Sequence, residues 1–325
     1  IKKHNPTYGY KRLSKLLKEP IHRTRYWYHD NAIPKPILTV SWLKEKDLLP
    51  LDINNKRLLI IAKVLGTTFG DGGIFKNLNA IFLSSSELEA VKEFGNDLKL
   101  VFRNEIEDNS RVIEGGVYGH SWCYQNTNRN VIRFFQALGA PIGKKSEMNL
   151  KIPDWIFLKE EIADEFFNSL FGNELGTPSI HRNKRQLTSL DIGLVTKKSL
   201  IKNKINFLNQ INTYLNNKHI KTGKITISKN GENILLRLSI NKTLDNYLAF
   251  VKTIKLNYCI YKQERLIKTA NEFINNKNNK IKELRNTING LTKRPYSESW
   301  IKNNLRLTEK SYKYVQNNKS IEKWN

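Results

Sequence analysis

The sequence predicts an α+β protein in which one αββαββα unit occurs twice, with short helical extensions before and after the two copies. Two apolar helices are predicted to end on an acid, Asp71 in one case and Glu174 in the other. Similar strands and helices follow each of them in the same order, and repeated order of this kind indicates a duplicated unit. We therefore expect two halves related by a pseudo-twofold axis, each with one antiparallel sheet.

The N-terminal segment, residues 1–56, is predicted to be a helical arm followed by a linker. Two helical stretches lie within residues 8–32 around Glu19-Pro20, and Arg23 and Arg25 open the second stretch. This length, and the order of two helices around a break, are typical of a helix-turn-helix whose second helix contacts DNA. A plain helical hairpin packed on the main domain is the alternative. The proline-marked residues 34–56 are predicted to be a linker or an arm.

The first copy of the unit is predicted at residues 57–153. Helical or alternating apolar patterns give its elements in order: the helix ending at Asp71, a strand at 79–86, a helix at 87–102, strands within 111–125, a helix at 130–141 and a basic segment at 143–148.

The second copy is predicted at residues 154–268 and repeats this order. Its elements are a helix at 160–174, a strand at 188–195, a helix at 198–215, strands at 223–229 and 233–240, a helix at 243–254 and a basic segment at 261–266. An Asn-Gly pair at 230–231 predicts the hairpin turn between the last two strands.

The C-terminal segment, residues 269–325, is predicted to be a helical extension. Residues 271–290 are rich in Asn and Lys, and predict an exposed helix or a linker. Residues 296–318 predict two short helices around a turn. They are interpreted either as a second DNA-contacting module or as a helix that packs on the core.

Composition indicates a polyanionic partner. Lysine and arginine number 55 against 30 acids, which gives a formal net charge of +25. Such a balance favours nucleic acid, because neutralising phosphates releases counterions; a solvated lysine-rich surface would give the same count. Cys123 and Cys259 match no metal-ligand spacing, so a reducing compartment is expected and a zinc site is not. No run of apolar residues is long enough to span a bilayer, and no membrane partner is expected.

Small side chains recur along one face of the first apolar helix. Residues at positions i, i+4 and i+8 of a helix share a face, so a row of small residues there lets a second helix approach closely. The second apolar helix has small or short residues in the corresponding region, and the two helices are expected to run side by side. The predicted interface contains Ala62, Gly66, Gly70, Ser169, Gly172 and Asn173.

This arrangement would bring Asp71 and Glu174 together at the same end of the helix pair. Two carboxylates at helix C-termini, where the macrodipole is already negative, form a site for hard divalent cations. Beside a phosphodiester, such ions can activate water and stabilise the leaving oxygen. Taken alone, an Asp in a Gly-Asp-Gly-Gly stretch such as that of Asp71 is typical of a turn. Taken alone, Glu174 is typical of a solvated residue at the end of a helix. Their equivalent positions in a repeated unit favour the metal site.

The segments "VLGTTFGDG" and "NSLFGNELG" resemble the paired motifs of the LAGLIDADG homing endonucleases. The resemblance covers residues 57–268 and includes the "LGAPIGKKS…IPDWI" stretch of archaeal-type members. It implies a monomeric, single-chain pseudo-dimer whose two sheets form a saddle over the major groove of double-stranded DNA. It also implies an intron-encoded, metal-dependent enzyme that cuts both strands of a long, asymmetric site and leaves short 3′ overhangs.

The resemblance also implies roles for individual residues. Asp71 and Glu174, with Gly70 and Asn173 beside them, correspond to the positions that hold Mg²⁺, for which Mn²⁺ or Ca²⁺ can substitute in binding. A lysine near each scissile phosphate would be Lys144 or Lys145 in the first half and Lys262 in the second. Two departures are expected to weaken the second metal position: Gly172 stands where an acid is common, and Leu175 where glycine is usual. A nicking enzyme, or a binder that has lost cleavage, would then result.

Sequence readout is expected from the strands, because alternate side chains of a sheet in the major groove face base edges. A single basic residue of this kind contacts phosphate more often than bases. The candidate DNA-binding residues are Lys76, Ser84 and Ser86 in the first half, and Arg182, Lys184, Arg185, Lys224, Lys229 and Arg237 in the second.

The main alternative is a non-cleaving DNA- or RNA-binding protein on the same scaffold, such as a regulator or an intron maturase. The two motif acids argue against it, because anions near phosphates weaken a pure binder. An intein is not favoured, because no nucleophilic residue opens the sequence and no His-Asn pair closes it. We expect a free-standing enzyme in the cytoplasm of a prokaryotic, archaeal-type cell, with an organelle as the alternative.

Overall fold

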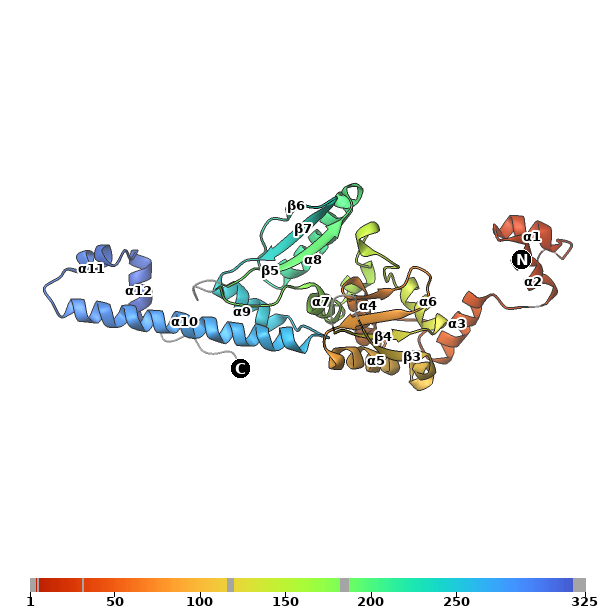
Figure 1. Cartoon of the computed structure of the whole chain (residues 1–325), viewed down its shortest axis with the longest axis horizontal. Helices are drawn as coiled ribbons and strands as arrows, with labels where there is room; N and C mark the ends of the chain where they lie inside the picture. Colours follow the sequence, from red (N-terminus) through yellow and green to blue (C-terminus); the bar gives the residue numbers. More distant parts are fainter. Residues whose placement is uncertain (1–3, 5, 31, 116–119, 182–186, 318–325) are drawn as a thin grey trace.

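The structure is a computed structural model that describes residues 4, 6–30, 32–115, 120–181 and 187–317. The molecule is elongated, with helices at both ends and two sheets between them (Figure 1). The predicted fold class is confirmed: helices combine with two separate antiparallel sheets. No helix in these described ranges is both long and apolar enough to cross a lipid bilayer.

Two helices, α4 (Leu58–Phe69) and α7 (Glu160–Glu174), lie side by side at the centre of the molecule (Figure 1). Both are predominantly buried, which is why apolar residues occupy more than one face of each. The aromatic ring of Phe69 meets that of Phe166 edge-on, with 5.3 Å between ring centroids. The pair therefore joins the two halves through direct packing.

The first sheet follows α4 and has the strand order β1-β2-β4-β3. Every neighbouring pair in it is antiparallel, and Leu83 lies opposite Tyr124 on the buried face. Its strands are β1 (Gly72–Ile74), β2 (Ile81–Ser85), β3 (Ser110–Glu114) and β4 (Trp122–Asn126). The helices of this half after α4 are α5 (Leu88–Phe102) and α6 (Arg129–Ala137), with short 3₁₀ turns at 104–109 and 145–147, and a further 3₁₀ turn at 154–158 leads into α7.

The second sheet follows α7 and has the order β5-β7-β6. Its strands are β5 (Leu190–Thr196), β6 (Thr226–Asn230) and β7 (Asn233–Ile240). The predicted hairpin turn is confirmed, and Gly231 in it has a φ of 60°. The position that corresponds to β1 is reduced to an isolated bridge between Leu175 and Ile192. This half continues with a 3₁₀ turn at 198–200 and with α8 (Ile201–Asn217) and α9 (Leu244–Thr253).

Of the two alternatives predicted for residues 34–56, a linker or an arm, the linker does not fit the structure, because these residues contain a helix that packs on the first half. Within them, α3 (Lys35–Glu45) packs on α6, and the hydroxyl of Thr39 donates a 2.7 Å hydrogen bond to Asn130. Leu43 and Leu48 are buried in the main hydrophobic core. The prolines that suggested a linker stand at the start of the helix, where a missing N–H costs nothing. The preceding helices α1 (Tyr10–Leu17) and α2 (Ile21–His29) form the predicted pair around Glu19-Pro20.

The C-terminal extension begins with α10 (Ile260–Thr292), which at 33 residues is about 50 Å long. The proposed boundary at residue 268 falls inside this helix. Beyond it, α11 (Glu298–Asn304) and α12 (Glu309–Asn317) fold back on its far end, away from the sheets (Figure 1). Ile288, Ile301, Tyr312 and Val315 form a small hydrophobic cluster there, separate from the main core. The alternative in which a C-terminal helix packs on the core is therefore wrong for α11 and α12.

Candidate functional site

The two central helices approach each other closely because a glycine, which has no side chain, stands at two of their contact points. A Cβ atom at Gly66 would lie 2.1 Å from the carbonyl oxygen of Phe166, and one at Gly70 would lie 2.4 Å from the Cβ of Asn173. Neither distance is physically attainable without displacing backbone. The same Cβ position at Gly70 is 3.5 Å from the Cγ of Glu174. Close packing thus brings the second acid to the C-terminal end of α4.

Asp71 and Glu174 hold corresponding places in the two halves. Gly72, directly after Asp71, pairs with Leu83 of β2, and Leu175, directly after Glu174, pairs with Ile192 of β5. The local backbone differs between them. Helix α4 ends at Phe69, before the acid, whereas α7 continues through Glu174 itself.

Two lysines from distant segments bind the carbonyl groups at the C-termini of these helices. The Nζ atom of Lys145 donates to the carbonyls of Gly70 and Gly72, the latter at 2.7 Å. Lys262, from the first turn of α10, donates in the same way to Gly172 at 3.0 Å and to Asn173 at 2.9 Å. Neither α4 nor α7 has a basic residue in its own last turn. The lysines therefore satisfy helix-end carbonyls from outside the helices.

Of the two lysines predicted for the first half, Lys145 is the one at this site. Its side chain is half-buried, whereas that of Lys144 is exposed. Lys262 is half-buried as well. The structure thus brings together Asp71, Glu174, Lys145 and Lys262 at one end of the α4–α7 pair.

The charges of these four groups interact. Burial, together with the negative charge of Asp71, raises the pKa of Glu174 to about 7, although the two lysines oppose this change. Burial also raises the pKa of Asp71, against Lys262 and Lys145. Asp71 is nevertheless exposed by its surface area, so solvent screening limits the change in its pKa. Burial lowers the pKa of Lys145, and the two acids counteract that decrease.

The donor set fits a hard divalent cation in part. Two carboxylates at adjacent helix ends are the ligands that Mg²⁺ and Ca²⁺ prefer. The carbonyls of Gly70 and Asn173 accept hydrogen bonds from the lysines, and each carbonyl oxygen has a second lone pair. No cluster of three or more His, Cys, Asp or Glu that could hold a metal occurs among the described residues. Phosphate or water oxygens would have to complete the coordination.

One predicted member of the helix interface needs correction. A Cβ at Gly172 would lie 2.0 Å from the carbonyl oxygen of Asn257, so this glycine admits the segment before α10 and does not face α4. Ser169 is buried and its hydroxyl lies 3.5 Å from the Nδ2 of the same Asn257. Ala62 is fully buried.

The outward face of the first sheet contains polar side chains from three strands. Ser84 lies on this face, opposite Cys123. Lys76 and Ser86 are exposed just beyond the strands. Sequence reasoning missed Arg111 and Gln125, which lie opposite each other on this face and share a 2.8 Å hydrogen bond. In the sequence, Arg111 and Gln125 alternate with the apolar residues Val112 and Tyr124, and this alternation could have predicted that they lie on the outward face.

In the second sheet, strand register separates two predicted DNA-binding residues. Arg237 is exposed and lies opposite Gly193 and Thr226 on the outward face. Lys229 lies opposite Ile234, a core residue, and so projects from the other face. The two candidates therefore lie on opposite faces of this sheet, and which of them contacts DNA stays a prediction.

The remaining predicted DNA-binding residues lie elsewhere or are not described. Lys224 is exposed just before β6. Arg23 and Arg25 are exposed on α2, where Arg23 forms a 2.8 Å ion pair with Glu19. Arg182, Lys184 and Arg185 lie outside the described residues.

Comparison with known proteins gives partial similarities. No protein-family model matches the chain. The chain is 30% identical over 239 residues to the tRNA-splicing ligase RtcB of Methanocaldococcus jannaschii, covering 67% of this chain and 24% of that protein. It is 28% identical over 156 residues to the DNA-directed RNA polymerase subunit Rpo1N of the same organism, covering 44% and 12%. The archaeal Lon protease of Pyrococcus abyssi is 32% identical over 123 residues, covering 37% and 11%. The chain thus spans about a quarter or less of each of these relatives.

Among solved structures, similar chains include the homing endonuclease I-DmoI in complex with DNA and Mn. It is 15% identical, with a TM-score of 0.40, and the match covers 61% of this chain and 97% of that one. The homing endonuclease I-WcaI bound to its DNA recognition sequence is 17% identical, with a TM-score of 0.38, and the match covers 68% and 97%.

Proposed function

We propose that this chain is a site-specific DNA endonuclease that hydrolyses a phosphodiester in each strand, using divalent metal held by Asp71 and Glu174. The proposed products carry short 3′ overhangs, and the proposed target is a long, asymmetric duplex site. Mg²⁺ is the proposed metal, with Mn²⁺ or Ca²⁺ able to bind in its place.

One observation carries the proposal: the two acids stand where the fold makes negative charge costly. Each lies at the C-terminal end of a central helix, where the macrodipole opposes an anion. Burial and the charge of Asp71 raise the pKa of Glu174 to about 7, so ionisation of Glu174 costs free energy in the absence of a cation. A divalent cation would remove that cost. Perturbed acids of this kind are characteristic of functional sites.

The residues of the site have distinct proposed roles. Asp71 and Glu174 would hold the metal, with the carbonyls of Gly70 and Asn173 beside them. A bound divalent ion supplies Lewis-acid stabilisation of phosphate oxygens and a more acidic water. Lys145 and Lys262 would neutralise charge on the phosphate nearest to each of them. Their ammonium groups are held at helix ends by main-chain carbonyls, so they are already oriented before DNA binds.

The surface of the molecule supports a DNA partner. The net charge of +25 favours binding to phosphates. Outward-facing Ser84, Arg111 and Gln125 in one sheet and Arg237 in the other can reach bases or phosphates. The flanking helical modules would extend this contact along the duplex.

The pattern of relatives favours a self-contained module over an RNA ligase. The match to RtcB covers 67% of this chain, and the matches to the polymerase subunit and the protease cover 44% and 37% of it. Because 67% together with either smaller share exceeds 100%, the region similar to RtcB overlaps each of the other two regions. Each match is also a minor part of the larger protein. Sequence that the ligase shares with the polymerase subunit, and sequence that it shares with the protease, does not carry the activity that distinguishes the ligase from either of them. A nuclease module inserted into different hosts fits this pattern.

The experiment is a selection of cleavable sites from a randomised duplex library with Mg²⁺, run in parallel with EDTA. We expect a single family of sites to be cut only with Mg²⁺. Retention of DNA without cutting in both Mg²⁺ and Mn²⁺ would reject the nuclease and support the non-cleaving binder. Sealing of RNA ends by the same preparation would instead support the ligase.

A further inference from the structure

Each lysine at the site is carried by a segment that is held by the opposite half of the molecule. Lys145 follows α6 of the first half, and its segment packs on α8 of the second half. Lys262 follows α9 of the second half, and its segment packs on α4 and α5 of the first half. Neither relationship was evident from the sequence.

The contact to Lys145 comes from a buried lysine. Lys204 of α8 is only 1% exposed, and its Nζ donates a 2.6 Å hydrogen bond to the main-chain carbonyl of Lys145. Asn203, next to it on α8, accepts a 2.7 Å hydrogen bond from the amide of Leu150. The backbone on both sides of the 3₁₀ turn at 145–147 is thus fixed by one helix of the second half.

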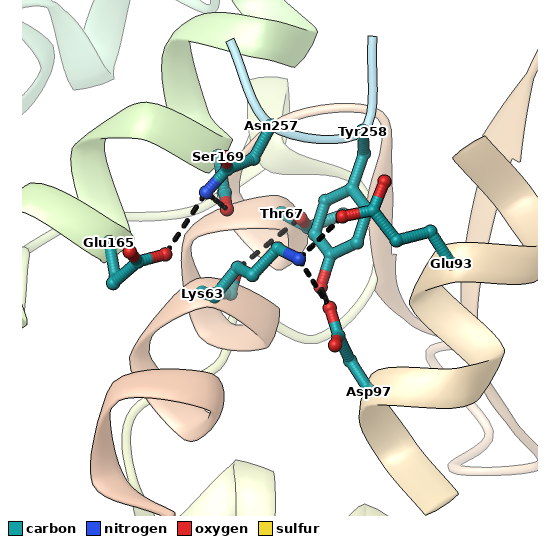
Figure 2. Close-up of polar contacts among 8 residues, drawn as sticks. All are labelled: Lys63, Thr67, Glu93, Asp97, Glu165, Ser169, Asn257 and Tyr258. Atoms are coloured by element: carbon teal, nitrogen blue, oxygen red, sulfur yellow. Dashed lines mark hydrogen bonds and ion pairs between the residues drawn. The ribbon is translucent and has the colours of Figure 1, made fainter. Parts of the chain in front are cut away.

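The contact to the Lys262 segment comes from a buried polar network, shown in Figure 2. Tyr258 is 3% exposed, and its hydroxyl donates a 2.5 Å hydrogen bond to Asp97 of α5. The Nζ of Lys63 of α4 lies 2.7 Å from Asp97, 2.6 Å from Glu93 and 4.5 Å from the centre of the Tyr258 ring. The ring also meets Phe94 edge-on at 5.7 Å. Tyr258 is therefore inserted between α4 and α5.

A carboxylate of the first half binds the start of α10 itself. Glu87 accepts hydrogen bonds from the amide of Tyr261 at 3.0 Å and from the thiol of Cys259 at 3.2 Å. An acid at a helix N-terminus is stabilised by the macrodipole and fixes the first turn, which contains Lys262. On the other side, Asn257 is bound to Glu165 of α7 at 3.1 Å. The segment is therefore held from both halves.

A buried ammonium such as that of Lys204 is costly, and an apolar side chain of similar size would fill the same space. The ammonium group of Lys204 donates to the main-chain carbonyl of Lys145, and the side chain of Lys145 in turn reaches the C-terminus of α4. We propose that Lys204 and the Tyr258–Asp97 pair are positioning residues that set Lys145 and Lys262, respectively, so that each half controls the lysine of the other. The expected effect on catalysis rests on the proposed nuclease function. The expected effect on the positions of the two lysine segments does not.

Two variants separate the two contacts. Lys204→Met removes the ammonium but keeps an unbranched side chain, and Lys202→Met, at an exposed position of the same helix, is its control. Tyr258→Phe removes one hydroxyl. Its control is Tyr214→Phe, because Tyr214 is also buried and donates to an aspartate, Asp164, at 2.8 Å.

The first readout is amide hydrogen exchange of the full chain without DNA. Loss of one hydrogen bond is worth about tenfold in a local opening equilibrium. We expect exchange about tenfold faster within 143–152 only for Lys204→Met, and within 255–262 only for Tyr258→Phe. Exchange that rises in both segments for either variant, or in neither, would overturn the positioning claim, whether or not the protein cuts DNA.

The second readout is strand-resolved, single-turnover cleavage of a site selected with Mg²⁺. Lys145→Met and Lys262→Met first identify the strand that each lysine serves. Misplacement of a catalytic group costs roughly tenfold to a hundredfold in rate. Lys204→Met should slow the Lys145 strand and Tyr258→Phe the Lys262 strand, with both controls unchanged. Equal slowing of both strands would contradict the proposal, whereas absence of any cutting by the wild type would reject the nuclease function and leave the exchange result to decide.

Discussion

Gly66 of α4 lies against the main-chain carbonyl of Phe166 of α7, and a Cβ atom there would be 2.1 Å from the carbonyl oxygen. Backbone atoms cannot rotate away as a side chain can, so any larger residue must push the two helices apart. Because Asp71 and Glu174 lie at the C-terminal ends of these helices, the separation at position 66 also sets the distance between the two acids.

Gly66→Ala is expected to lower the free energy of unfolding by about 2 kcal/mol or more, the usual cost of overpacking. Gly290→Ala is the matched control, because Gly290 lies in α10 and, within the part of the chain that the structure describes, no atom other than its chain neighbours and its own helix backbone lies within 4 Å of its Cβ position. That change should raise stability by up to about 1 kcal/mol through helix propensity. Denaturant unfolding of both variants checks this; equal stabilisation by both would show that the helices do not pack as described.

Stability without metal should depend on the ionisation of Glu174. Its pKa of about 7 in the folded chain lies above the ordinary value of 4.5. Between these values the folded protein holds a proton that the unfolded chain has released, so the free energy of unfolding falls as pH rises. Glu174→Gln removes this loss, and should be up to about 3 kcal/mol more stable than wild type at pH 8 but similar at pH 4.5.

Melting temperatures in EDTA at the two pH values measure this effect. Glu161→Gln, an exposed position on the same helix, is the control. Addition of Ca²⁺ at pH 8 should then stabilise the wild type more than Glu174→Gln. A Glu174→Gln variant that is less stable than wild type at pH 8 in EDTA would mean that this carboxylate is not under electrostatic strain.

The repeated architecture and both acids could be predicted from the sequence, because helical and strand periods and the spacing of small residues are local properties. The roles of Tyr258, Asp97 and Lys204 could not, since their contacts join positions far apart in the chain. Gly172 was assigned to the wrong contact for a related reason. It lies near the predicted ridge, but the backbone of Asn257 from another segment covers it.

Two other differences have simpler causes. The prolines before α3 suggested a linker, although proline is equally suited to the first turn of a helix. The separation of Lys229 from Arg237 follows from the alternation of side chains along a strand. Lys229 pairs with Ile234 across the hairpin, and a residue opposite a core position must share its face. Counting back from the Asn-Gly turn could have given the correct face.

The two faces of the second sheet predict different effects on DNA binding. Arg237→Ala on the outward face should weaken binding and reduce the slope of log K against log salt by about one. Lys229→Ala removes the same charge from the opposite face and should change this slope little. Binding titrations at several salt concentrations distinguish them. A larger loss for Lys229→Ala would place DNA on the other side of the sheet.

The structure also predicts which part of the N-terminal region stabilises the main core. Leu48 is fully buried there, so Leu48→Ala should cost about 2–5 kcal/mol in stability. Removal of residues 1–30, which contain α1 and α2, should leave the melting temperature of the core nearly unchanged. Leu13 of α1 is buried but does not belong to that core cluster. A large decrease in melting temperature after this truncation would contradict the separation.

The central claim is that Asp71 and Glu174 together hold the metal that cuts DNA. Its most direct measurement is single-turnover cleavage of the selected site in Mg²⁺ by wild type, Asp71→Asn and Glu174→Gln, with DNA affinity measured for each in Ca²⁺. We expect each substitution to reduce cleavage of at least one strand by a factor of about a thousand or more, with DNA still bound. Cleavage of both strands at near wild-type rates by either variant would contradict the account.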